Sequence, residues 1–147
     1  MGELLGIPEW LAAIGFVAAA LLAWLGLGGL LHRKQMLALA KRRQNPNAAE
    51  FVEQMTLQTS REAADFMWEM LREYTGQYAT PHPTDHLYDD LCIDNGDVDI
   101  DWPEQWAEHR ALEMRVLPDW PKGWETTVLN FGRWLDMAYL SNSSPRT

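Results

Sequence analysis

The longest uncharged run of the chain, from Trp10 to Leu31, contains 22 residues. A helix rises about 1.5 Å per residue, so the run extends roughly 33 Å, enough to cross a hydrocarbon core of about 30 Å. Pro8 stands just before it, where a proline is compatible with a first helical turn. A cleavable signal peptide is the competing interpretation. However, the preceding residues carry two glutamates and no lysine or arginine, and the run is longer than a usual signal core. The sequence therefore predicts an N-terminal segment 1–31 with a retained transmembrane helix over residues 10–31.

Basic side chains follow this span and have no counterpart before it. They are Arg33, Lys34, Lys41, Arg42 and Arg43. Because basic flanks stay on the cytoplasmic side, we expect the N-terminus outside and the rest of the chain in the cytoplasm, at the inner (plasma) membrane of a bacterium. Residues 32–47 form a predicted basic juxtamembrane neck, which ends at Asn-Pro-Asn. These residues either contact anionic lipid headgroups as well or only set the orientation, and the second interpretation is favoured.

One face of the predicted span carries small residues at steps of three or four. They are Ala12, Gly15, Ala19, Ala23 and Gly26. Small residues at this spacing let two helices approach closely, which suits a homo-oligomer or docking on a larger membrane protein. Such series also arise by chance in spans rich in alanine and glycine, so both interpretations stay open.

Charge is divided unevenly along the chain. Residues 1–43 hold two acids and five bases, net +3, whereas residues 44–147 hold 19 acids and seven bases, net −12. This balance argues against a nucleic-acid binder, which needs a broad basic surface. An acidic head attracts a basic partner surface, although solubility is the commoner reason for such a composition. The single cysteine cannot form an internal disulfide and suits a reducing compartment.

Residues 48–140 are expected to form an acidic helical domain, and residues 141–147 a flexible tail. A first helix should end near Thr56, and a second should begin at a capping box of Thr59 with Glu62 and end at Gly76. The second helix shows one apolar stripe at helical spacing, formed by Ala63, Phe66, Met67, Met70, Leu71 and Tyr74.

Two proline-bearing loops, residues 79–86 and 117–123, divide the rest of this domain. A third helix is expected from Pro103 to about Met114, and a last one from about Glu125. Period-two alternation over residues 97–101 fits one short strand. A lone strand has nothing to pair with, so the predicted fold class is all-α.

The acidic turn over residues 89–97, Asp-Asp-Leu-Cys-Ile-Asp-Asn-Gly-Asp, and the Thr127-Val128 pair resemble an acyl carrier protein. The resemblance covers about residues 60–140 and implies a small acyl-carrier-like helical bundle. In that family an Asp-Leu-Gly-x-Asp-Ser-Leu stretch bears the serine that receives a phosphopantetheine arm, and a Thr-Val pair opens the last helix. Here Asn95 stands in place of the serine, Cys92 replaces the glycine, and Pro103 interrupts the expected second helix. The chain is closer in character to an uncharacterised bacterial family of acidic, carrier-like proteins without this serine.

Carboxylates are densest around the third predicted helix, where Asp97, Asp99, Asp101 and Glu108 are weak candidates for a metal site. Oxygen ligands at alternating positions suit calcium, and Glu108 lies eleven residues after Asp97, as in an EF-hand loop. Trp102 occupies the position of the essential glycine, so an EF-hand is not expected. Carboxylates that favour the positive end of a helix dipole are the preferred interpretation.

The first loop and the single cysteine offer further chemistry. His82, Asp85 and His86 lie close enough in sequence to share a metal ion, although ordinary loop histidines are favoured. Cys92 has apolar neighbours, which predicts a small buried residue instead of a nucleophile. We therefore predict no catalytic residue, no cofactor and no enzyme.

Five tryptophans crowd the last third of the chain, at positions 102, 106, 120, 124 and 134. A domain of this size does not easily bury five indoles, so Trp120 and Trp124 are predicted to contact a partner. The sequence thus predicts a single-span, membrane-anchored, non-enzymatic interaction or accessory protein whose cytosolic acidic domain docks on a partner protein. One alternative is an acyl-carrier-related protein that handles acyl chains at the membrane. A second is a small membrane immunity or defence protein, which no residue supports specifically.

Overall fold

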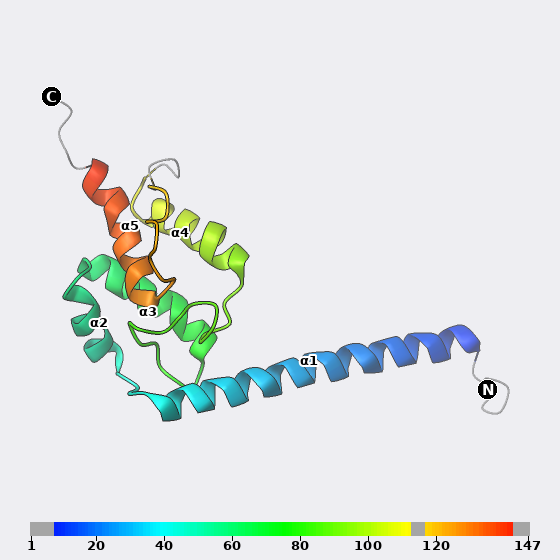
Figure 1. Cartoon of the computed structure of the whole chain (residues 1–147). Coiled ribbons are helices and arrows are strands. Elements are labelled where there is room, and N and C mark those ends of the chain that lie inside the picture. The colour runs from blue at the N-terminus through cyan, green and yellow to red at the C-terminus, as the bar shows by residue number, and fades with distance from the viewer. Residues whose placement is uncertain (1–7, 113–116, 143–147) are drawn as a thin grey trace. The chain divides into compact units, whose positions relative to one another are not determined.

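The computed structural model describes residues 8–112 and 117–142 (Figure 1). The chain divides into two compact units, Met1–Gln35 and Met36–Thr147, and we call the second one the acidic unit. All regular elements of the described residues are helices, which confirms the predicted all-α class. The only β-type pairing in this part of the chain is an isolated bridge between His86 and Thr127.

Helix α1 (Glu9–Arg42) contains the predicted span and is long and apolar enough to cross a membrane. It begins beside Pro8, whose carbonyl accepts a hydrogen bond from the Leu11 amide at 2.9 Å. The large apolar side chains of the span are exposed, from 43% at Leu11 to 77% at Trp24. The helix then continues through the basic residues of the predicted neck and ends just before the Asn-Pro-Asn break.

The second unit holds the last turns of α1 and all later helices. These are α2 (Ala48–Thr56), α3 (Arg61–Thr75), the π-helical turn η2 (Asp97–Asp101), α4 (Trp102–His109) and α5 (Val128–Asn142). Helix α3 packs against α2 and against α5 (Figure 1). Gly132 of α5 lies close to α2, because a Cβ there would lie 2.8 Å from the Cε of Met55.

The caps of the second and third helices are set by polar side chains. Asn47 and Glu50 form a capping box on α2. The predicted capping box of Thr59 with Glu62 is wrong by one residue, since Ser60 caps α3 and accepts a hydrogen bond from the Ala63 amide at 3.1 Å. The Ser60 hydroxyl also donates to Asp136 of α5 at 2.6 Å, which explains why this serine is preferred. Gly76 ends α3 with φ +58°, as predicted.

The later helices differ from prediction at their ends. Residues 97–101 form a π-helical turn that leads into α4, so the short-strand alternative is wrong. Helix α4 ends at His109, before the expected end near Met114, which lies outside the described residues. Helix α5 begins at Val128 instead of Glu125, because the Thr127 hydroxyl accepts a hydrogen bond from the Asn130 amide at 3.2 Å.

The core of the second unit gathers around α3. Met36 and Leu39 of α1 belong to it, together with the loop residues Leu87, Leu91 and Ile93. Burial of an apolar side chain contributes about 1.5–3 kcal/mol, so these residues hold the loop on the helices. Trp106 of α4 is fully buried.

A buried ion pair ties the end of α1 to the first loop. Arg43 donates two hydrogen bonds to the Asp85 carboxylate, from Nε at 2.6 Å and from Nη2 at 2.7 Å. Its Nη2 also donates to the Thr80 carbonyl at 2.8 Å. Asp85 is only 2% exposed and accepts a further hydrogen bond from the His82 amide. Asp85 therefore acts as a structural partner of Arg43.

Candidate docking groove

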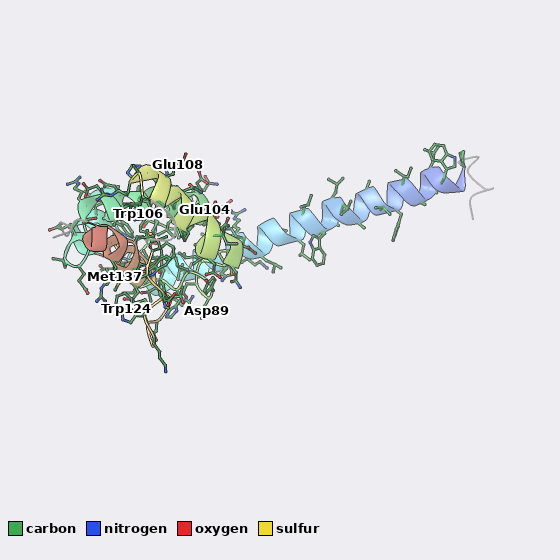
Figure 2. The ribbon with its side chains drawn as sticks, turned by 90° about the horizontal axis from the view of Figure 1, so that it is seen from above. Asp89, Glu104, Trp106, Glu108, Trp124 and Met137 are labelled. Atoms are coloured by element: carbon green, nitrogen blue, oxygen red, sulfur yellow. The ribbon has the colours of Figure 1, made fainter. Side chains whose placement is uncertain are left out.

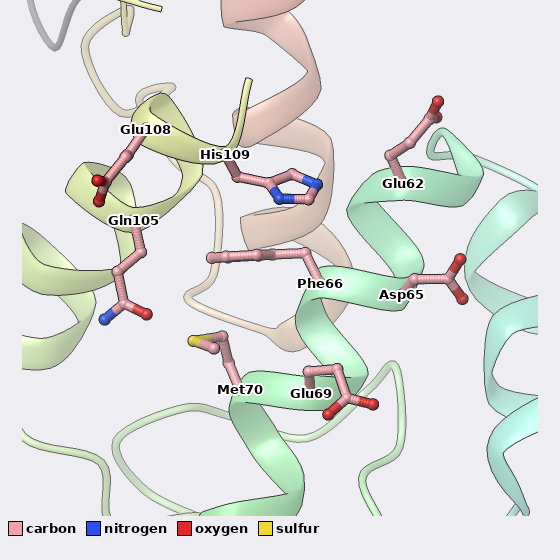
Figure 3. A pocket seen from close by; sticks show the side chains of 8 residues that line it. All are labelled: Glu62, Asp65, Phe66, Glu69, Met70, Gln105, Glu108 and His109. Carbon is pink, nitrogen blue, oxygen red and sulfur yellow. The ribbon is translucent and has the colours of Figure 1, made fainter. Parts of the chain in front are cut away.

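An open groove of about 600 Å³ lies between α3 and α4. Figure 3 shows Phe66 and Met70 of α3 projecting toward α4, with His109 and Gln105 of α4 on the opposite side. Four acidic residues also line the groove, namely Glu62, Asp65 and Glu69 of α3 and Glu108 of α4. We call this feature the α3–α4 groove.

The floor of the groove is fixed by aromatic packing. The Phe66 ring meets the Trp106 ring edge to face, with 5.2 Å between centroids and an interplanar angle of 62°. Trp106 is held in turn by a hydrogen bond from its Nε1 to the Leu135 carbonyl at 3.1 Å. Edge-to-face pairs contribute about 0.5–1.5 kcal/mol beyond burial, so the groove is largely preformed.

The rim of the groove is acidic but partly paired with local arginines. Arg61 lies 3.6 Å from Asp65, and Arg72 lies 3.7 Å from Glu69. These two pairs are exposed, and exposed pairs contribute only about 0–1 kcal/mol, so cations of a partner can replace them. Arg110 is more firmly held, because it lies 3.6 Å from Glu62 and 5.3 Å from the centre of the Trp106 ring.

The sequence did not single out this groove. The sequence places Phe66 and Met70 in the apolar stripe and Glu108 among the weak metal candidates. Both apolar side chains are only half buried, at the edge of that stripe nearest α4. The one hint in the sequence is the width of the apolar stripe of α3, which is greater than a single neighbouring helix would cover.

The carboxylates of the acidic turn take separate roles. Asp97 accepts a hydrogen bond from the Tyr74 hydroxyl at 2.6 Å, and Asp99 accepts one from the Tyr88 hydroxyl at 3.1 Å. Glu108 lies on the rim of the groove, on the outside of α4 (Figure 2). Within residues 8–112 and 117–142, no three histidine, cysteine or acidic side chains are placed to hold a metal ion.

The loop residues with possible chemistry are placed apart from the groove. His82 Nδ1 lies 2.9 Å from the Thr84 hydroxyl, and His86 lies 3.9 Å from Glu125. The expectation that Cys92 is buried is wrong, because its side chain is exposed. Its backbone has φ +53°, in the left-handed region that favours glycine. Asn95 is exposed as well.

The predicted interaction residues are exposed to different degrees. Trp120 and Trp124 are half buried, and the Trp120 Nε1 donates to the Trp124 carbonyl at 3.2 Å. The small residues of α1 are exposed, and a Cβ added at Gly15 or Gly26 would meet no atom within 4 Å. Within its own unit this face of α1 is therefore open.

Comparison with protein-family models, with curated proteins and with solved structures finds no match for this chain. The acyl-carrier resemblance therefore rests on the residues of the acidic turn and the Thr127-Val128 pair alone.

Proposed function

We propose that this protein is a single-span, membrane-anchored, non-enzymatic interaction or accessory protein whose acidic helical unit docks on a basic segment of a partner. The observation that carries the proposal is the α3–α4 groove, which combines a fixed apolar floor with a carboxylate rim. The basic residues after the apolar span support a cytoplasmic position for this unit.

The chemistry of the groove favours an amphipathic basic helix as the docked segment. Such a helix inserts apolar side chains at spacings of three and four residues into a hydrophobic groove. Phe66 and Met70, four residues apart on α3, offer two neighbouring positions for such side chains. The unit Met36–Thr147 holds 19 acids and ten bases, and its net charge of −9 steers a basic partner toward it and raises the association rate.

Photo-crosslinking in intact membranes tests this function. A photoreactive residue replaces Gln105, inside the groove, and in a matched chain it replaces Glu53, which is exposed on α2. The protein with the photoreactive residue at position 105 should crosslink to one protein, through a peptide rich in lysine and arginine. The protein with the photoreactive residue at position 53 should not. Crosslinking that is equal at both positions, or absent at Gln105, would contradict docking at the groove.

A carrier-related role has one specific observation in its favour. Cys92 adopts φ +53° at the position where the carrier motif has glycine. The mass of the intact protein from its native host tests this alternative. An adduct of phosphopantetheine mass would support it, and an unmodified chain would exclude a covalent carrier, as the amide of Asn95 leads us to expect.

A further inference from the structure

A second hollow of the acidic unit, of about 300 Å³, has mostly aromatic walls. Tyr88, Trp120, Phe131 and Trp134 line it, together with the carboxylate of Asp99. We call it the aromatic pocket. Its volume lies at the lower end of the range for small-molecule sites, about 300–1,000 Å³.

The two indoles of the pocket present carbon surface instead of hydrogen-bond donors. The Trp134 Nε1 donates to the Pro118 carbonyl at 2.8 Å, and the Trp120 Nε1 donates to the Trp124 carbonyl. Each indole has one N–H group, so neither has a donor left for a ligand. Their centroids lie 5.6 Å apart at an angle of 58°, and Phe131 lies 5.4 Å from Trp134. Aromatic side chains without a free N–H donor therefore form most of the pocket wall.

Among the described residues that line this pocket, Asp99 is the one charged side chain. It accepts a hydrogen bond from the Tyr88 hydroxyl at 3.1 Å. Burial, the hydrogen bond to Asp99 and the charge of Asp99 raise the pKa of Tyr88 to about 12. The raised pKa reflects burial of the phenol and the hydrogen bond that it donates to Asp99.

The same aromatic cluster already holds a cation at a neighbouring ring. The Arg133 guanidinium carbon lies 4.3 Å from the centre of the Trp124 ring, and Trp124 meets Trp120 edge to face at 6.2 Å. Cation–π attraction is effective within about 6 Å of a ring centre, and indole is the strongest of the aromatic partners.

We propose that the aromatic pocket binds a small organic cation through its quaternary ammonium group. Such a group is bulky and carries no N–H donor, so it matches π faces and one carboxylate. An inorganic cation is disfavoured, because calcium requires six to eight oxygen ligands and the pocket supplies a single carboxylate. A neutral apolar ligand would gain nothing from the charge of Asp99.

Binding of choline to the full-length protein tests the proposal. The protein is placed in nanodiscs of phosphatidylglycerol, which contain no choline group, and binding is followed by saturation-transfer NMR of the ligand methyl protons. The comparison ligand is 3,3-dimethylbutanol, an uncharged molecule of the same shape. Choline should bind about fivefold or more tightly than this molecule, the difference that cation–π attraction and one carboxylate supply.

Asp99→Asn is the informative variant, because asparagine keeps an acceptor for Tyr88 and removes only the charge. Asp101→Asn is its matched control, since Asp101 is exposed two residues away and does not line the pocket. Asp99→Asn should weaken choline binding about fivefold, and Asp101→Asn less than about twofold. Equal binding of choline and the neutral molecule, equal effects of the two variants, or no saturable choline signal would overturn the proposal.

Phosphatidylcholine nanodiscs distinguish two sources of the ammonium group. Loss of the choline signal in these discs identifies a lipid headgroup as the occupant, and an unchanged signal identifies a free solute. Either result, together with selective binding of choline over 3,3-dimethylbutanol, supports the proposal.

Discussion

The apolar part of α1 and the acidic unit contain the same kinds of apolar side chain in opposite surroundings. Trp24 of α1 is 77% exposed, whereas Trp106 of α4 is fully buried, with its indole N–H bonded to a carbonyl. The acidic unit thus supplies its own apolar environment through tertiary packing. Among the described residues 8–35 of its own unit, the span of α1 packs against nothing, and a bilayer is the environment that its length and composition match.

The largest expected effect separates these two tryptophans. Trp106→Ala should lower the free energy of unfolding of the acidic unit by about 3–5 kcal/mol, because it leaves a cavity beneath Phe66 and α5. Urea denaturation of the full-length protein in detergent measures this loss. Trp24→Ala is the control and should leave the unfolding midpoint unchanged. A comparable loss from Trp24→Ala would show that the span packs on protein.

The neighbouring arginines at the end of α1 give the next contrast. Arg43→Gln should cost about 3 kcal/mol or more, because it leaves the buried Asp85 carboxylate without its cation. Arg42→Gln should cost less than about 1 kcal/mol, since Arg42 is 65% exposed and lies 3.8 Å from Asp90. The same urea titration measures both variants. Equal losses would mean that the buried pair has no special role.

A charge inside the apolar span of α1 should affect membrane insertion and leave the stability of the acidic unit unchanged. Leu22→Arg places a cation near the middle of the apolar run, where insertion costs about 2.5–3.5 kcal/mol. We expect part of the protein to move from the membrane to the soluble fraction, while the unfolding of the acidic unit stays the same. Leu22→Phe is the matched control. Retention of Leu22→Arg in the membrane at the wild-type level would argue that the span is not inserted.

The rim of the groove gives a smaller effect, on binding instead of stability. Glu69→Gln together with Glu108→Gln removes two rim charges and should slow association with a basic amphipathic peptide severalfold at low salt. Glu53→Gln with Glu104→Gln removes equal charge away from the groove and serves as the control. Surface plasmon resonance measures both rates. Equal effects of the two pairs would indicate that net charge alone attracts the peptide.

What the sequence predicted correctly is local. The stripe of α3 and its end at Gly76 follow from spacing and from one glycine, and the helical span follows from one uncharged run. The errors occur where distant residues decide the structure. Ser60 caps α3 in place of Thr59 because Asp136, 76 positions away, accepts a hydrogen bond from the Ser60 hydroxyl.

The candidate sites were the least predictable part of the molecule. The Arg43–Asp85 pair joins residues 42 positions apart, and no motif around either residue indicates that the two side chains meet. The α3–α4 groove forms only when two helices meet, so the pattern of neither helix alone indicates it. Trp120 was singled out for its place in a proline-rich loop, but its pocket also needs Asp99 from the acidic turn.

The smallest effect concerns alkaline pH and again only the acidic unit. Burial and the hydrogen bond to Asp97 raise the pKa of Tyr74 from 10.0 to about 12. The folded chain therefore holds this proton more tightly than the unfolded chain, so the contribution is complete below pH 10 and is lost as pH rises through 12. Tyr74→Phe should flatten the decline of the unfolding free energy over this interval, measured by urea titration at several pH values. Tyr88 has a pKa raised equally, so some slope should persist until Tyr88→Phe is added. An unchanged slope in the double variant would show that neither tyrosine is linked to folding through its aspartate.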